Sequence, residues 1–173
     1  FFFKHLIFIF LGVIVIFTFS SINQKRLFKF SFFLFFISLF FLFLVPLIGV
    51  EVKGSQRWID FYLLPRFQPI EIVKPFLIVS ISLILSSEKY SNLYLKYFLT
   101  LTITLIVVLF LVLQPDLGQT LLVLLSWSVL IFTSGISIVF LLILFLILII
   151  AISYLVIFVP KFGYIKNRLL SFF

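Results

Sequence analysis

The 44 residues from Leu117 to Pro160 contain no aspartate, glutamate, lysine or arginine, and this run constrains the fold more than any other part of the sequence. As a single helix it would extend about 66 Å at about 1.5 Å per residue, whereas the hydrocarbon core of a bilayer is about 30 Å thick. The run must therefore fold back on itself. Its only turn-like stretch is Thr133–Ser137, which combines threonine, serine and glycine. We expect two consecutive membrane-spanning helices with that stretch between them.

The composition of the whole chain also indicates a membrane protein. Of its 173 residues, 65% are hydrophobic and 10% are charged, and the mean hydropathy is +1.44. A soluble domain has about 45–50% apolar and about 25% charged residues. The net charge of +8 does not indicate a nucleic-acid partner, because the basic residues lie between apolar runs, where cations meet lipid headgroups or anionic ligands. The absence of cysteine excludes disulfides and thiolate metal sites.

Four further apolar runs complete the prediction of an all-α, polytopic bundle of about six transmembrane helices, in a single domain over residues 1–173. The strands of a β-barrel would instead be alternating segments of about 10 residues. The expected spans are residues 6–19 (beginning nearer residue 1), 30–48, 69–87, 97–113, 117–132 and 138–159. The first is not expected to be a signal peptide, because no small-residue cleavage site follows it. Because the chain has no methionine, we expect an internal piece of a longer protein.

Six spans put both ends of the chain on one side of the membrane. The polar loop Gly49–Phe67, the turn Gln114–Asp116 and the residues from Pro160 onward then share that side. This side has eight lysines and arginines and the other side has five, so the positive-inside rule predicts a cytoplasmic long loop. The eight cations are Lys4, Lys53, Arg57, Arg66, Lys74, Lys161, Lys166 and Arg168.

Two stretches repeat one arrangement at this membrane face. Gln68–Glu71 opens the third span, and Gln114–Asp116 lies between the fourth and the fifth. In both, we expect the proline at a helix start, where no backbone hydrogen bond is lost, and the carboxylate in the first turn, where the helix dipole favours negative charge. Ordinary helix-start chemistry would explain them at an exposed end. Here they adjoin hydrocarbon, where ionisable groups usually face a bundle interior or a water-filled cavity.

The remaining candidates are two cations and a tryptophan. Lys74 lies three residues after Glu71, so the two side chains can pair, and Pro75 is expected to kink the helix. A neutralising salt bridge explains this pair as well as a polar pocket does. Arg57 could grip a phosphate through two hydrogen bonds, whereas Trp58 fits an anchor at the membrane interface. No metal-ligand cluster, phosphate loop, nucleophile motif or dinucleotide fingerprint occurs in the sequence, so we expect no cofactor and no metal.

Three polar segments carry a resemblance to a known family. They are Gly49–Asp60, Gln68–Lys74 and Gln114–Thr120. In this order and at this spacing they resemble the SEDS (FtsW/RodA/SpoVE) family of bacterial cell-wall proteins, which act in shape, elongation, division and sporulation. The Glu-Val-Lys-Gly form of the first segment, and the glutamine after Gly118, are more similar to the division branch than to the elongation branch.

The resemblance covers the whole chain as helices two to seven of a ten-helix fold. Phe1–Lys4 is similar to the start of the second helix, and Tyr164–Phe172 to the segment after the seventh. It implies that Gly49–Phe67 faces the periplasm, against the charge count. We follow the motifs on this point, because outward-facing cations suit a lipid-linked pyrophosphate substrate.

The resemblance implies a peptidoglycan glycosyltransferase of the bacterial inner membrane that polymerises lipid II. An acceptor sugar hydroxyl would attack the anomeric carbon of a donor held on undecaprenyl pyrophosphate. That reaction needs a base for the hydroxyl and cations for the leaving pyrophosphate. The expected partners are lipid II, membrane lipids, a penicillin-binding transpeptidase and the divisome proteins, with no nucleic acid.

The catalytic aspartate of the family lies in an outer loop beyond the position that matches residue 173, so we expect this chain alone to be inactive. The family motifs contain Arg57, Gln68, Glu71, Lys74, Gln114 and Asp116, which we predict to be substrate-cavity or supporting-network residues and not the base. The chain departs from the family pattern at Ile70, where a small residue is usual, and at Pro75. Three alternatives stay open at this point: a flippase for a lipid-linked precursor, the elongation paralogue, and charges that serve helix packing alone.

Overall fold

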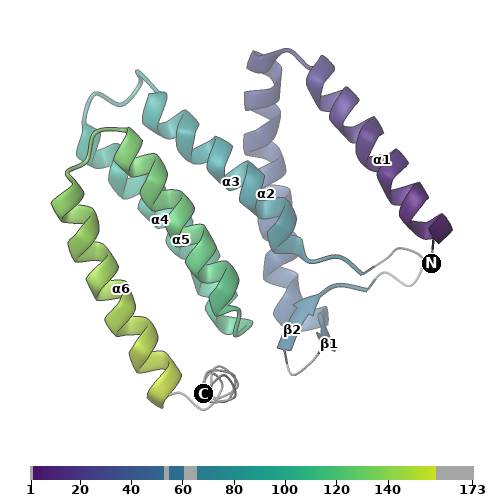
Figure 1. Ribbon diagram of the computed structural model, residues 1–173. Coiled ribbons are helices and arrows are strands. Elements are labelled where there is room, and N and C mark those ends of the chain that lie inside the picture. Colours follow the sequence, from purple (N-terminus) through teal and green to yellow (C-terminus); the bar gives the residue numbers. More distant parts are fainter. Residues whose placement is uncertain (1, 53–54, 61–65, 159–173) are drawn as a thin grey trace.

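The computed structural model of the protein describes residues 2–52, 55–60 and 66–158. Within these residues the chain forms six helices and one antiparallel hairpin (Figure 1). The elements are α1 (Phe2–Ser21), α2 (Gln24–Ile48), β1 (Val50–Val52), β2 (Ser55–Trp58), α3 (Pro69–Ser86), α4 (Leu93–Leu113), α5 (Leu117–Thr133) and α6 (Ile138–Phe158). The prediction of an all-α helix bundle is confirmed. The two-stranded hairpin within the long polar loop is an addition that the sequence did not predict.

Two helices begin earlier than predicted, at local caps that lie outside the apolar runs. α2 starts at Gln24, because the side chain of Asn23 accepts a hydrogen bond from the Lys25 N–H, 3.2 Å away. α4 starts at Leu93, because Asn92 accepts from the Tyr94 N–H in the same way. Asparagine at the N-cap satisfies a backbone donor that the helix itself cannot satisfy. The helix start is therefore set by the cap, not by the lipid boundary.

Three of the described helices are long and apolar enough to cross a membrane: α2, α3 and α4. The described apolar parts of α1, α5 and α6 are shorter, at His5–Ser21, Leu117–Thr133 and Ile138–Ala151. The turn within the long uncharged run lies where it was predicted, and it contains Gly135 at φ +100°, a backbone conformation that glycine adopts without strain.

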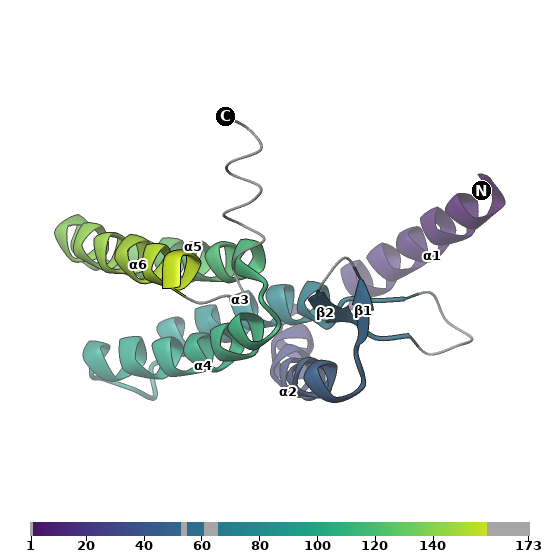
Figure 2. The same ribbon diagram turned by 90° about the horizontal axis from the view of Figure 1, so that it is seen from below.

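The packed core belongs to α2, α3, α4 and α5. Its largest fully buried side chains include Phe35 and Leu42 from α2, Ile70 from α3 and Leu111 from α4. The side chains of α1 from His5 to Ser21 are all exposed, and α6 packs against α5. Figure 2 shows α1 extending away from the other helices.

The bundle brings the hairpin and the α4–α5 turn to the same end, as predicted (Figure 1). The α1–α2, α3–α4 and α5–α6 connections lie at the other end. Which end faces the cytoplasm stays a prediction, as does the single domain. Several residues that entered the predictions lie outside the described part of the chain, namely Lys53, Lys161, Lys166, Arg168 and the segment Tyr164–Phe172.

Candidate functional site

A bulge in the hairpin carries Arg57. Val50 pairs with Trp58 and Glu51 pairs with Gln56, so Arg57 is the extra residue of β2 between the two pairs. Such a bulge bends the strand and redirects the extra side chain. The hairpin continues into a bridge between Ile59 and Phe67, which returns the chain to the start of α3.

The α4–α5 turn carries Asp116, which is the N-cap of α5. Its Oδ1 accepts from the Gln119 N–H at 3.3 Å, and its backbone carbonyl accepts from both the N–H and the Oγ1 of Thr120. Asp116 is thus one residue before the first turn in which it was predicted, and Pro115 precedes the cap. The α3 start follows the predicted arrangement, with Pro69 in the first turn after Gln68 and with Glu71 also in that turn.

The carboxylate of Asp116 lies in a buried polar cluster. Arg57 donates from Nη2 to the Pro115 carbonyl at 2.8 Å, and its Nε lies 3.5 Å from Asp116 Oδ2. The same Oδ2 accepts from Gln68 Nε2 at 3.1 Å. The side chain of Asp116 is 6% exposed and that of Arg57 is 25% exposed. Three elements that are distant in the sequence therefore meet on one carboxylate.

A second, more open cluster lies on the adjoining turns of α3 and α5. Lys74 Nζ is 2.8 Å from Glu71 Oε2, so the predicted pair is present. Gln119 joins both partners, because it accepts from Lys74 Nζ at 3.0 Å and donates to Glu71 Oε1 at 2.9 Å. The side chain of Lys74 is 17% exposed and that of Glu71 is 52% exposed.

Gln119 is the site residue that the sequence reasoning missed. It lay within the third family segment but was assigned no role. A signal was available, because Asp116 and Gln119 have the spacing of an N-cap and the third residue of a helix, as in a capping box. In a capping box the Gln side chain returns to the cap, whereas here it reaches across to α3.

Gln114 faces away from both clusters, toward α2. It is the C-cap of α4, is 2% exposed, and donates from Nε2 to the Leu42 carbonyl at 3.2 Å. The predicted candidates thus lie together at one end of the bundle, but they differ in how far their side chains are buried. Gln114 and Asp116 are enclosed, whereas Arg57, Gln68, Glu71 and Lys74 retain exposed surface.

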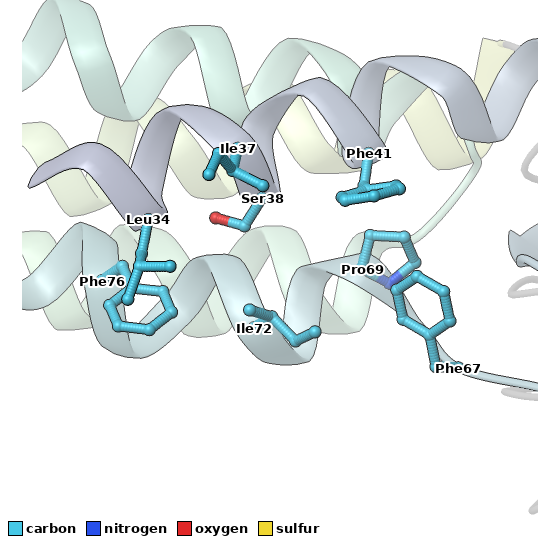
Figure 3. Close-up of a pocket in the computed structure, with 8 residues that line it drawn as sticks. All are labelled: Leu34, Ile37, Ser38, Phe41, Phe67, Pro69, Ile72 and Phe76. Atoms are coloured by element: carbon cyan, nitrogen blue, oxygen red, sulfur yellow. The ribbon is translucent and has the colours of Figure 1, made fainter. Parts of the chain in front are cut away.

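An apolar cavity of about 100 Å³ adjoins this end of the bundle, between α2 and α3. In Figure 3, Leu34, Ile37, Ser38 and Phe41 come from α2, facing Ile72 and Phe76 of α3, with Phe67 and Pro69 at the end nearer the polar clusters. The Ser38 hydroxyl donates to the carbonyl of Phe35 in its own helix. The cavity therefore suits an apolar group and not a sugar.

Trp58 pairs with Val50 at the end of β2 and is partly exposed. Its role as an anchor at the membrane interface stays a prediction.

Over residues 2–52, 55–60 and 66–158, no group of three histidine, aspartate or glutamate side chains is arranged to hold a metal ion.

Comparison with known proteins assigns the family. The sequence model of the FtsW/RodA/SpoVE family, described as a cell cycle protein, matches residues 1–173. The chain belongs to this family. The resemblance carried by the three polar segments is confirmed.

Individual relatives agree with this assignment, and the chain is most like FtsW in sequence. The chain is 32% identical over 171 residues to the "Probable peptidoglycan glycosyltransferase FtsW" of Wigglesworthia glossinidia brevipalpis. The aligned region covers 98% of this chain and 44% of the relative. Among solved structures it resembles the rod shape determining protein RodA of Thermus thermophilus, with a TM-score of 0.70, 33% identity, and coverage of 82% of this chain and 46% of that one.

A second solved chain is similar over more of the sequence. It comes from a structure described as "Structural coordination of polymerization and crosslinking by a peptidoglycan synthase complex". The TM-score is 0.78 and the identity 28%, over 95% of this chain and 49% of that chain. The chain thus spans less than half the length of the FtsW relative and of the two solved chains. The apolar helices and the FtsW and RodA relatives identify the chain as a multi-pass membrane protein.

Proposed function

We propose that the full-length protein carrying this chain is a peptidoglycan glycosyltransferase of the bacterial inner membrane that polymerises lipid II. The observation that carries the proposal is the gathering of Arg57 and Lys74, each held by a carboxylate, at one mouth of an apolar bundle. Lipid II has a prenyl chain in the bilayer and a pyrophosphate at the surface. A protein that uses it needs cations at the level where the hydrocarbon ends.

The degree of burial divides the candidate residues into two roles. Arg57 and Lys74 keep part of their surface exposed, so a pyrophosphate could reach them. Asp116 and Gln114 are enclosed and act through the groups that they hold. We assign Arg57 and Lys74 to the leaving pyrophosphate, with Gln68 and Glu71 beside them, and Asp116 and Gln114 to the supporting network.

The carboxylates hold the two cations in place before the substrate arrives. A preorganised cation stabilises developing negative charge without a reorganisation cost at the moment of reaction. As the single bond between the anomeric carbon and the pyrophosphate oxygen breaks, negative charge accumulates on the leaving pyrophosphate, and Arg57 and Lys74 would face that charge. No described residue is assigned as the base for the acceptor hydroxyl.

The proposed partners follow from the same family relationship. The neighbouring structure is described as a complex that coordinates polymerization and crosslinking. We propose that the full-length protein likewise works with a crosslinking penicillin-binding transpeptidase, in the division complex rather than the elongation complex, since the curated relative above carries the FtsW name.

The experiment reconstitutes the full-length protein in proteoliposomes that contain lipid II. Glycan strands are measured by gel, and translocation of a fluorescent lipid II is measured in parallel. Arg57→Ala and Lys74→Ala should each lower polymerisation by at least about tenfold, because each removes a charge that opposes the leaving group. Lys89→Ala is the matched control, since Lys89 is exposed at the other end of the bundle.

Two outcomes would contradict the proposal. One is an unchanged polymerisation rate in both variants at normal expression and folding. The other is translocation without any glycan product in the unmodified protein, which would favour a flippase.

A further inference from the structure

The inference begins with a backbone carbonyl in α2 that its own helix cannot satisfy. In an α-helix the carbonyl of residue 42 accepts from the N–H of residue 46. Residue 46 is a proline inside α2, and proline has no N–H. Leu42 is 0% exposed, so water is not at hand to replace the missing donor. An unpaired buried carbonyl is costly.

Gln114 supplies the missing donor from another helix. Its Nε2 lies 3.2 Å from the Leu42 oxygen, and both residues are buried. The two are 72 residues apart in the sequence. The contact therefore joins the last turns of α2 to the end of α4, at the depth where the polar clusters begin.

The same two parts of the molecule meet again one residue further along the turn. α2 leads through Gly49 directly into the hairpin that carries Arg57. Gln114 leads directly into Pro115 and Asp116, whose carbonyl and carboxylate face Arg57. The α4–α5 turn is thus connected twice to one part of the molecule: to α2 through the Gln114–Leu42 hydrogen bond, and to the hairpin that follows α2 through the Arg57 contacts.

We propose that Gln114 is a positioning residue that uses the carbonyl freed by Pro46 to hold the α4–α5 turn against α2, and so keeps Asp116 opposite Arg57. The proposal rests on the proposed function only for its activity readout. The tether itself is a structural claim that can be tested without any substrate.

The test is a double-mutant cycle in the full-length protein. Gln114→Met removes the donor while keeping an unbranched side chain, and Pro46→Ala returns an N–H to α2 for the Leu42 carbonyl. Gln114→Met alone should lower the apparent Tm by several degrees, because it leaves that carbonyl without a donor. In the Pro46→Ala background the same change should cost little stability, because the helix now satisfies the carbonyl itself.

Positioning predicts a different result for the geometry of the site. The described chain has no native cysteine, so spin labels can be attached at Gln56→Cys and Leu121→Cys, two exposed positions on β2 and α5, in a background free of other cysteines. Gln114→Met should broaden the distance distribution between the labels and lower kcat/KM for polymerisation by about tenfold or more. Both defects should persist in the Pro46→Ala double variant, because its stability returns but the tether does not.

Pro75→Ala is the matched control. Pro75 also lies inside a helix, α3, but among the described contacts Gln114 donates to a carbonyl of α2 and to none of α3. In that background Gln114→Met should cost as much stability as in the unmodified protein. The proposal is overturned if the label distances do not change in Gln114→Met, or if Pro46→Ala restores distances and activity together with stability. An unmodified protein that makes no glycan would overturn the proposed function, while the label distances would still decide the tether.

Discussion

Polar side chains bond in two different ways at the hairpin end and in the middle of this bundle. At the hairpin end they bond to groups far away in the sequence: Gln68 reaches Asp116 across 48 residues, and Lys74 reaches Gln119 across 45. In the middle of the bundle the buried hydroxyls of Ser38, Thr104 and Ser128 donate to carbonyls three or four residues back in their own helices.

The difference separates polar groups that are compatible with any packing from groups that require one particular packing. A hydroxyl that bonds to its own helix is satisfied wherever the helix lies, and its small size allows neighbouring helices to approach closely. A carboxylate or amide that bonds across elements is satisfied only when those elements are correctly placed. We therefore expect the hairpin end to depend on its polar groups far more than the middle does.

The largest effect is expected at Asp116. Asp116→Ala should destabilise the full-length protein by about 3 kcal/mol, because it removes the buried partner of Arg57 and the cap of α5. Asp116→Asn should cost less, since asparagine keeps the cap. The measurement is unfolding in lipid nanodiscs. Asp60→Ala is the matched control, because it breaks the more exposed pair with Arg66 and should cost less than about 1 kcal/mol.

The next effect is expected at Arg57. Arg57→Lys should cost about 1–2 kcal/mol, because an ammonium cannot reproduce the fork that spans the Pro115 carbonyl and the Asp116 carboxylate. The same substitution at the exposed Arg66 should change stability by less than about 0.5 kcal/mol. Equal effects at the two arginines would mean that the guanidinium geometry at residue 57 is unimportant for folding.

A smaller effect is expected at Gln119. Gln119→Leu should cost about 1 kcal/mol, because it removes the amide between Glu71 and Lys74, while water can still reach the exposed carboxylate. Gln56→Leu serves as the control, since the Gln56 side chain is exposed on the hairpin. If the two substitutions change the unfolding midpoint alike, the amide bridge contributes nothing to the stability of this end.

The smallest effects compare two buried threonines of α4. Thr100 accepts from Trp127 Nε1 at 3.3 Å, whereas the hydroxyl of Thr104 bonds to the Thr100 carbonyl. Thr100→Val should cost about 1 kcal/mol because it leaves the indole N–H without its acceptor. Thr104→Val should cost less than about 0.5 kcal/mol. A Thr104→Val variant as unstable as Asp116→Ala would remove the distinction between the two regions.

Local signals were enough to predict most of the helical structure. Hydropathy located the apolar runs. The length of the uncharged run required a turn, and its threonine, serine and glycine residues placed that turn at Thr133–Ser137. The starts of α2 and α4 were predicted late because the apolar run was taken as the helix, while Asn23 and Asn92 extend it into polar sequence. The pairing of Lys74 with Glu71 followed from helical spacing.

By itself, the sequence determined the order of the helices, the turns between them and the end at which the candidate site residues lie, since these depend on lipid burial and on hydrogen bonds within a few residues. Only the tertiary structure decided which groups meet there. The bulge that redirects Arg57, the reach of Gln119 to α3 and the bond of Gln114 to Leu42 all join elements distant in the sequence. Pro46 in the sequence predicts that the Leu42 carbonyl lacks its helical donor, but which other group donates to that carbonyl depends on how the helices pack.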